Sequence, residues 1–206
     1  MKGRWLTALT MTLALSAFPG QSPAAPLSEA QAVTLTRRLQ AIVDDPAMPL
    51  PGLSVLAVRA GEIVYTRQFG HKRLATASTP AEPVDADTMF RIASISKLVT
   101  ALGVMKMVEQ GVLSLDADVG AYLGYRLRNP HFPDQPITLR MLLTHTASLR
   151  DEGGYRWPPE VDLKDVLLPG GRHHGAGAMW SRNHAPGRWF EYVNLNSGLV
   201  ATIMEA

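Results

Sequence analysis

The sequence predicts an α+β fold in which a helix and a β-hairpin come first and a mostly helical region follows. Three observations support this class. A capping-box pattern opens an amphipathic segment at Ser28, and two β-rich segments flank a turn at residues 60–61. After residue 111, short helical segments alternate with loops. With 206 residues the chain is long enough to bury a sizeable core.

The first helix is expected to begin after Ser28 and to end near Asp44, before Asp45-Pro46. Apolar residues recur at helical spacing and give this helix one side that can face a core. They are Ala32, Val33, Leu35, Leu39, Ile42 and Val43.

The hairpin is expected to pair residues 53–59 with residues 62–69. Both segments are largely apolar, which indicates a sheet that is covered on at least one face. Residues 70–87 contain two prolines and are expected to form a connecting loop.

The longest predicted helix runs from about Ser94 to Gln110, and Gly111 is typical of the position that follows a helix end. It contains a Ser-x-x-Lys pattern formed by Ser94 and Lys97. Residues three apart lie on one helix face, with Cβ atoms roughly 5–6 Å apart. The hydroxyl and the amine can therefore meet.

The remaining residues of this helix indicate where Lys97 points. Lys106, Glu109 and Gln110 mark a polar side, so Lys97 projects among the apolar residues Ala101, Val104 and Val108. Burial favours the neutral amine, which can accept the serine proton and create a nucleophile. The helix N-terminus would favour an oxyanion beside Ser94. A helix-capping serine with a surface lysine is the alternative interpretation of this pattern.

Four short helices are expected after residue 111. The first ends at Leu123, and the second spans residues 139–145 after a Thr138 cap. The third spans residues 162–168, and the last runs from near Asn196 to the last residue. Residues 150–188 show little periodicity and are expected to form a long loop that shapes ligand choice. The final helix has no glycine cap and no basic last turn, so we expect the chain to be truncated at its C-terminus.

Residues 1–24 have the pattern of a secretory signal peptide, with Lys2 and Arg4 before an uncharged apolar stretch and a small-x-small site at 22–24. We therefore expect a secreted or periplasmic bacterial protein with no stable membrane span after signal removal. An N-terminal membrane anchor is the alternative. The chain has no cysteine, which excludes disulfides and a bacterial lipoprotein anchor.

Charge argues against nucleic acid as a partner. Residues 1–24 hold two basic side chains and no acidic ones, so 18 of the 20 basic side chains remain against 18 acidic ones. A chain without a basic excess has no electrostatic footprint for nucleic acid.

Three segments, in order, resemble the serine β-lactamase and penicillin-binding-protein-like hydrolases, in particular the class C β-lactamase branch with its esterases and D-aminopeptidases. Residues 90–97, Phe-Arg-Ile-Ala-Ser-Ile-Ser-Lys, are similar to the nucleophile segment of that branch. Residues 137–149 resemble its LLTHTSGL landmark, with Ala-Ser where Ser-Gly is usual. Residues 186–194 resemble the segment that carries its Tyr-x-Asn motif, here Tyr192 and Asn194.

The resemblance implies a β-lactamase/transpeptidase-like fold and a partial domain over residues 25–206. Residues 25–87 would supply a helix and a hairpin of the α/β part, and residues 88–206 the helical part. Ser94 would be the acylated nucleophile, and Lys97 would hold the proton network around it. Tyr192 would be the general base or its partner.

Asn194 would bind Lys97 and the substrate amide. The resemblance implies a structural role for His145; the alternative role of a histidine at this position is that of a catalytic base. His173, His174 and His184 lack a carboxylate or cysteine partner at ligand spacing, so we predict no metal and no cofactor.

One departure leaves two functions open. The third motif of the family, Lys-Thr-Gly or His-x-Gly, lies on a strand after the helical region, and we expect this chain to end before that strand. The first hypothesis is a serine hydrolase that forms an acyl-enzyme with small-molecule substrates, namely β-lactams, D-amino-acid peptides or small esters. The second is a non-catalytic remnant, or a module that binds cell-wall peptides without turnover. Substrate and oligomeric state are not predicted.

Overall fold

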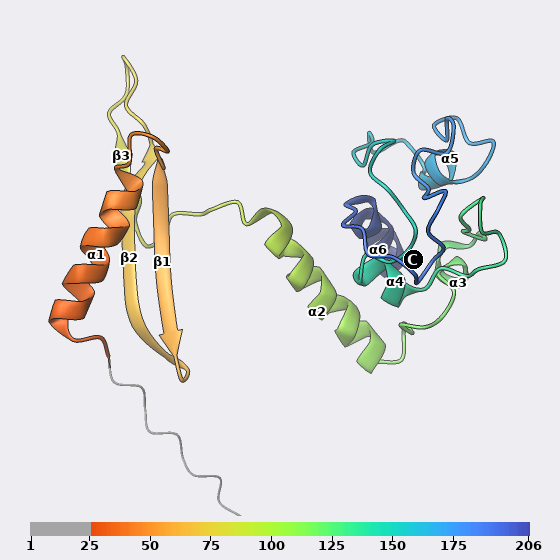
Figure 1. Ribbon diagram of the computed structural model, residues 1–206, viewed down its shortest axis with the longest axis horizontal. Coiled ribbons are helices and arrows are strands. Elements are labelled where there is room, and N and C mark those ends of the chain that lie inside the picture. The colour runs from red at the N-terminus through yellow and green to blue at the C-terminus, as the bar shows by residue number, and fades with distance from the viewer. Residues whose placement is uncertain (1–25) are drawn as a thin grey trace, which may run out of the picture. The chain divides into compact units, whose positions relative to one another are not determined.

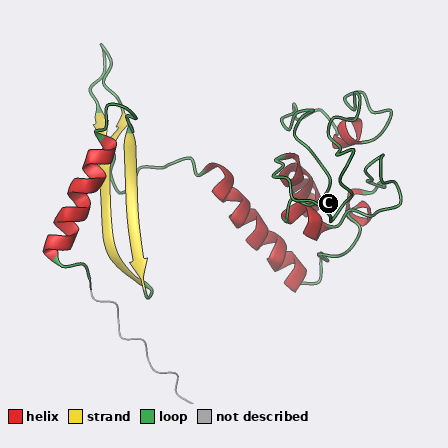
Figure 2. Ribbon diagram, viewed as in Figure 1, coloured by secondary structure: helices red, strands yellow, loops and turns green. Residues whose placement is uncertain are grey.

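The computed structural model describes residues 26–206, so the expected signal peptide at residues 1–24 lies outside the described residues. The chain divides into two compact units after Phe90. Helices and strands of both units are drawn in Figures 1 and 2. The α+β class predicted from the sequence is confirmed, since the strands lie in the first unit and most helices in the second.

The first unit consists of α1 (Glu29–Val43) and a three-stranded antiparallel sheet in the order β1-β2-β3. Its strands are β1 (Gly52–Arg59), β2 (Glu62–Arg73) and β3 (Glu82–Pro83). The predicted capping box is present at Ser28 and Gln31. A hydrogen bond of 2.9 Å joins the Thr36 hydroxyl on α1 to the Tyr65 hydroxyl on β2, and Figure 1 shows α1 beside the sheet.

The second strand is longer than the sequence analysis predicted, and part of the expected connecting loop forms β3. The Val84 N–H donates to the Gly70 carbonyl at 3.0 Å. Ion pairs then join Lys72 to Asp85 and Arg73 to Glu82 across the two segments. These long-range pairs stabilise a short strand that local residue preferences did not predict.

The second unit begins with the 3₁₀ helix η1 (Ala93–Ile95), followed directly by α2 (Ser96–Glu109). The remaining helices are α3 (Gly120–Leu123), α4 (Leu139–Leu143), α5 (Leu163–Leu167) and α6 (Leu195–Glu205). The predicted start of the long helix at Ser94 is therefore wrong by two residues, because Ser94 lies in η1. No side-chain cap is present at the start of α2, so the interpretation of Ser94 as a capping serine is also wrong.

The core of the second unit is apolar and brings α2, α4, α5 and α6 together. Val104 on α2, Leu142 on α4, Val166 on α5 and Leu199 on α6 are all at most 1% exposed. The expected inward side of the long helix is thus confirmed at Val104. Other apolar residues of α2 face solvent, namely Leu98, Val99, Leu102 and Met105.

The segment 150–188 is irregular, as expected, but it is fixed at both ends. The Arg150 N–H donates to the Met179 carbonyl, and the Ser181 N–H donates to the Ser148 carbonyl, both at 2.9 Å. Between these ends, Trp180 is buried and its indole N–H donates to the Leu167 carbonyl at 3.0 Å. The segment is therefore a folded loop that contributes buried residues to the core of the second unit.

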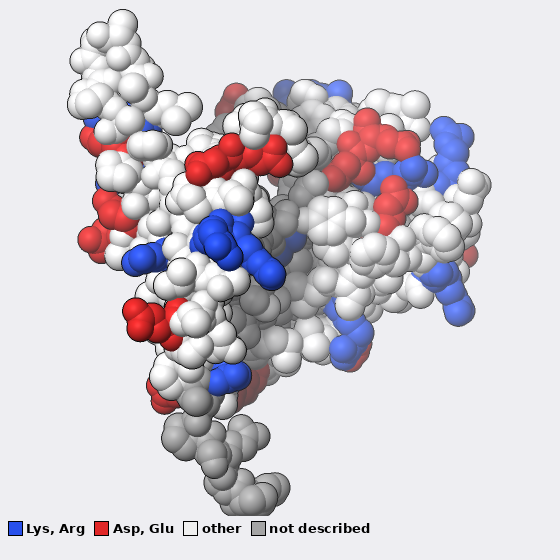
Figure 3. Space-filling model, turned by 60° about the vertical axis from the view of Figure 1, so that its left-hand side comes forward, with Lys and Arg blue, Asp and Glu red and all other residues white. Residues whose placement is uncertain are grey.

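The surface is mixed in charge. On the face drawn in Figure 3, Lys and Arg side chains alternate with Asp and Glu side chains. Among residues 26–206, no helix has both the length and the apolar character needed to cross a membrane.

Candidate active site

A strained turn presents the Ser94 hydroxyl at the start of α2. Ala93 has a φ of +44°, the left-handed region that costs a non-glycine residue about 1–2 kcal/mol. The Ile95 N–H donates to the Ile92 carbonyl at 3.0 Å and closes the turn. Ser94 is exposed, so its hydroxyl is accessible. Strain of this kind is common at functional sites.

Lys97 and Tyr192 both reach the Ser94 hydroxyl. The Lys97 amine donates to Ser94 Oγ at 3.3 Å, and the Tyr192 hydroxyl donates to the same oxygen at 2.7 Å. The Lys97 Nζ atom also lies 5.1 Å from the centre of the Tyr192 ring. The expected meeting of hydroxyl, amine and phenol is therefore present in the structure.

Asn194 completes this group from the start of α6. Its side-chain carbonyl oxygen accepts a hydrogen bond of 3.0 Å from Lys97 Nζ. Lys97 thus donates to one oxygen three positions earlier, in η1, and to another 97 positions further along the chain. The structure brings together all four residues that the resemblance singled out, Ser94, Lys97, Tyr192 and Asn194.

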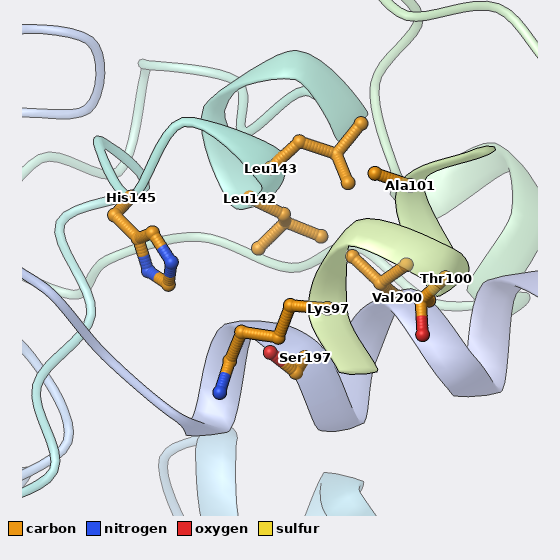
Figure 4. Close-up of a pocket in the computed structure, with 8 residues that line it drawn as sticks. All are labelled: Lys97, Thr100, Ala101, Leu142, Leu143, His145, Ser197 and Val200. Atoms are coloured by element: carbon orange, nitrogen blue, oxygen red, sulfur yellow. The ribbon is translucent and has the colours of Figure 1, made fainter. Parts of the chain in front are cut away.

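The stem of Lys97 lines a small pocket between α2, α4 and α6, drawn in Figure 4. Most of the lining is apolar, with Ala101, Leu142, Leu143 and Val200 around the lysine stem. Lys97 is accordingly half-buried, while its amine reaches polar partners at the pocket edge.

Tyr192 is tuned by its neighbours. Hydrogen bonds with the Lys97 amine and the Ser94 hydroxyl lower the pKa of the Tyr192 phenol below its ordinary value, while burial and the nearby charge of Asp151 act in the opposite direction. A lower pKa increases the share of phenolate, the form that can accept a proton from Ser94.

His145 supports the segment that carries Tyr192. The Val193 N–H donates to His145 Nδ1 at 3.1 Å, so the neutral ring carries its proton on Nε2. The His145 ring lies 4.5 Å from the Tyr192 ring, centre to centre. The Glu191 N–H donates to the His145 carbonyl at 2.9 Å. Burial and the charge of Lys97 lower the pKa of His145.

Asp151 is the residue of this group that sequence reasoning missed. Its carboxylate accepts hydrogen bonds from the Asn194 main chain at 2.8 Å, from the Asn194 side-chain amide at 2.9 Å and from the Leu195 N–H at 3.1 Å. Asp151 lies two positions past the landmark segment that ends at Leu149, in a stretch without periodicity. No local signal marks such a long-range contact.

Two further histidines, His173 and His184, pack against aromatic rings. The His184 ring stacks on Trp189 at 4.6 Å between ring centres, and His173 lies 5.3 Å from Trp157. Within the described part of the chain, no three His, Asp or Glu residues are gathered in a way that could hold a metal ion.

Comparisons with known proteins agree with this geometry. A family model described as Beta-lactamase matches residues 36–206. The chain is 37% identical over 178 residues to "Esterase EstB" of Burkholderia gladioli, covering 78% of this chain and 43% of that protein. It is 31% identical over 160 residues to "Penicillin-binding protein 4*" of Bacillus subtilis, covering 74% of this chain and 32% of that protein. The chain thus spans less than half the length of either relative.

Solved structures share the fold. "EstCE1, a hydrolase with promiscuous acyltransferase activity" matches 84% of this chain and 47% of its own, with a TM-score of 0.59 and 25% identity. A structure titled "Beta-lactamase/D-alanine Carboxypeptidase" from Yersinia pestis matches 86% of this chain and 49% of its own, with a TM-score of 0.59 and 22% identity. These neighbours confirm the fold class that the sequence resemblance implied.

Proposed function

Because this chain belongs to the beta-lactamase family, we propose that it is a serine hydrolase in which Ser94 is the nucleophile. The observation that carries the proposal is the pair of hydrogen bonds at the Ser94 hydroxyl, 2.7 Å from the Tyr192 phenol and 3.3 Å from the Lys97 amine. A nucleophile within reach of a base, which is itself oriented by a further group, is typical of covalent catalysis.

The reaction follows from these contacts in two halves. In the first, Ser94 Oγ attacks the substrate carbonyl carbon, and the serine proton passes to the coupled pair of Tyr192 and Lys97. The tetrahedral intermediate then collapses, the bond to the leaving group breaks, and the pair returns the proton to that group. An ester joins the acyl group to Ser94. In the second half, water loses a proton to the same pair and attacks the ester carbonyl carbon. The bond to Ser94 Oγ then breaks, the pair returns the proton to Ser94 Oγ, and the acid is released.

Tyr192 and Lys97 act as a unit in this scheme. A tyrosine of ordinary pKa is a weak base at neutral pH because nearly all of it is protonated. The Lys97 amine favours the phenolate form of Tyr192, so the base depends on both groups. Asn194 holds the Lys97 amine through its side-chain oxygen at 3.0 Å and has a second role in our proposal, to bind the substrate amide.

The substrates that we propose are carboxylic esters, β-lactams and D-amino-acid peptides. Each presents a carbonyl to Ser94. Ester hydrolysis is supported by the 37% identity of this chain to Esterase EstB. Action on peptides or lactams is supported by the name of the penicillin-binding protein that is 31% identical.

Covalent labelling tests the proposal. The full chain is incubated with a fluorophosphonate probe and, separately, with a fluorescent penicillin, alongside a Ser94→Ala variant and a Ser114→Ala control. We expect label on the unsubstituted chain and the control but not on Ser94→Ala. Folded protein that takes up neither probe at Ser94 would favour the alternative, a module that binds cell-wall peptides without turnover.

We further propose that residues 1–24 direct secretion, as the sequence pattern predicts. N-terminal sequencing of the chain recovered from the periplasm tests this. A mature protein that begins near residue 25 is expected, and an uncleaved N-terminus would contradict it.

A further inference from the structure

We propose that Asp151 is a positioning residue that fixes the side chain of Asn194 with its carbonyl oxygen toward Lys97. The inference rests on the proposed function, because it assigns Asp151 a task at the same site. Asp151 does not contact Ser94 in our proposal. It acts through Asn194, which in turn holds the Lys97 amine.

The donor and acceptor pattern fixes the orientation of Asn194. An ionised carboxylate can only accept hydrogen bonds, so the Asn194 group that faces Asp151 must be the NH₂ group. That contact is 2.9 Å long. The opposite end of the amide is then the carbonyl oxygen, and it accepts from the Lys97 amine at 3.0 Å. A lysine amine in its charged form has only donors, so it requires this orientation and no other.

The same carboxylate also holds the main chain at the start of α6. Asn194 occupies the position before the helix, and its own side chain makes no capping bond. Asp151 takes over this task and accepts from the Asn194 and Leu195 N–H groups at 2.8 and 3.1 Å. A carboxylate at a helix N-terminus is favourable because it satisfies free N–H groups and complements the helix dipole. Asp151 thereby positions both the backbone and the amide of Asn194.

Substitution can test the positioning task. Asp151 Oδ2 accepts from both the main-chain N–H and the side-chain NH₂ group of Asn194, and Oδ1 accepts from the Leu195 N–H. In Asp151→Asn only one of these two places keeps an oxygen: toward Leu195 it preserves that part of the cap and sets NH₂ against NH₂ at Asn194, and toward Asn194 it preserves the positioning contact. Asp151→Leu has a similar branched shape and no acceptor in either place, so nothing at position 151 then fixes the Asn194 amide.

A reciprocal exchange should restore the acceptor. In the double variant Asp151→Asn/Asn194→Asp, the amide now at position 151 donates to one oxygen of the carboxylate at position 194. The other oxygen of that carboxylate remains available to Lys97. The single variant Asn194→Asp places the carboxylates at positions 151 and 194 against each other. We therefore expect it to be impaired, and only the double variant to recover activity. A purely structural role for Asp151 predicts no recovery in the double variant.

The test measures the rate of Ser94 labelling by the fluorophosphonate probe, and kcat and KM for p-nitrophenyl butyrate, in the full chain. We expect Asp151→Leu to lower the labelling rate and kcat about 100-fold, the loss that a displacement of reacting groups by ~1 Å produces, with a smaller change in KM. The double variant should recover at least a tenth of the lost rate. Asp162→Asn is the matched control, because Asp162 caps α5 through the Lys164 N–H at 2.8 Å and makes no hydrogen bond or ion pair with Ser94, Lys97, Tyr192 or Asn194.

A second measurement does not depend on activity. In ¹⁵N-labelled protein, the Asn194 side-chain amide protons should exchange slowly with water in the unsubstituted chain and in Asp162→Asn. They should exchange faster in Asp151→Leu, which has no acceptor for them. If the unsubstituted chain takes up no label at Ser94, the proposed function fails, and this exchange rate still decides whether Asp151 positions Asn194.

Two results would overturn the inference. One is an Asp151→Leu variant that matches Asp162→Asn in both labelling rate and amide exchange. The other is a loss in Asp151→Leu with no recovery in the double variant, which would assign Asp151 to capping or overall charge alone.

Discussion

The Tyr192 phenol donates a 2.7 Å hydrogen bond to Ser94 Oγ across 98 positions of sequence. This contact joins the turn before α2 to the segment before α6. The two helices meet in the core of the second unit, where Val104 and Leu199 are both fully buried. Packing of these helices therefore sets the distance between nucleophile and phenol.

Removal of the phenol hydroxyl should abolish most activity without unfolding the protein. Tyr192→Phe keeps the ring that packs on His145 but removes the proton acceptor. Since a positioned acid or base contributes typically 10²–10⁴-fold, we expect the Ser94 labelling rate to fall by about that factor. The thermal midpoint should change little because Tyr192 is 46% exposed. A variant that is labelled at the full rate would remove Tyr192 from the mechanism.

Two lysines of α2 offer a matched comparison. Lys97→Ala removes the donor to Ser94 and Asn194, whereas Lys106→Ala removes only a surface ion pair with Glu109. We expect Lys97→Ala to lower hydrolysis of p-nitrophenyl butyrate by about 10²–10⁴-fold. Lys106→Ala should retain full activity, since exposed pairs contribute only about 0–1 kcal/mol. Equal rates in the two variants would contradict the proposed role of Lys97.

The pH dependence of labelling should report the coupled pair. Only the phenolate of Tyr192 accepts a proton, so the labelling rate should rise as pH rises through an apparent pKa below the ordinary tyrosine value of 10.0. Because Lys97 is the main cause of the lowered pKa, Lys97→Ala should move this midpoint upward. The measurement is the fluorophosphonate labelling rate from neutral to alkaline pH. A rate that is flat with pH, or a midpoint that Lys97→Ala leaves in place, would contradict this assignment.

Stability of the second unit should depend on pH through His145. The pKa of this group is lower in the folded chain than its ordinary value of 6.5, so the unfolded chain binds its proton first as pH falls. The contribution is complete above pH 6.5 and is lost as pH falls through the lower, folded-state pKa. Lowering the pH therefore destabilises the folded chain through protonation of His145.

Urea unfolding at a series of pH values, followed by tryptophan fluorescence, tests this prediction. Trp157, Trp180 and Trp189 all lie in the second unit and report on it. His145→Asn is the comparison variant, because asparagine tolerates the φ of +56° found at this position and does not titrate. The variant should lose this part of the pH dependence, and identical slopes in both proteins would rule out His145 as its source.

Local sequence signals predicted those parts of the site that local structure determines. The spacing of Ser94 and Lys97 indicated one helical face, and the structure places their polar atoms 3.3 Å apart. The capping box at Ser28 likewise predicted the start of α1. The approach of Tyr192 and Asn194 is long-range, and only the family resemblance indicated it.

Features that depend on distant partners escaped prediction for a physical reason. Asp151 follows no periodic pattern, and its partners lie 43 and 44 positions away. The 3₁₀ start before α2 depends on a left-handed Ala93, a conformation that alanine does not favour by itself. The short strand β3 likewise depends on pairing with β2 rather than on its own residues.

Main-chain bonds hold Arg150 to Met179 and Ser148 to Ser181 at the base of the long loop. The same loop includes Gly170, which is exposed and has no atom within 4 Å of where a Cβ would lie. An insertion beside Gly170 is well separated in sequence from the base, where Asp151 contacts Asn194. Evolution, or a protein engineer, has a place to graft new recognition elements onto an unchanged reaction centre.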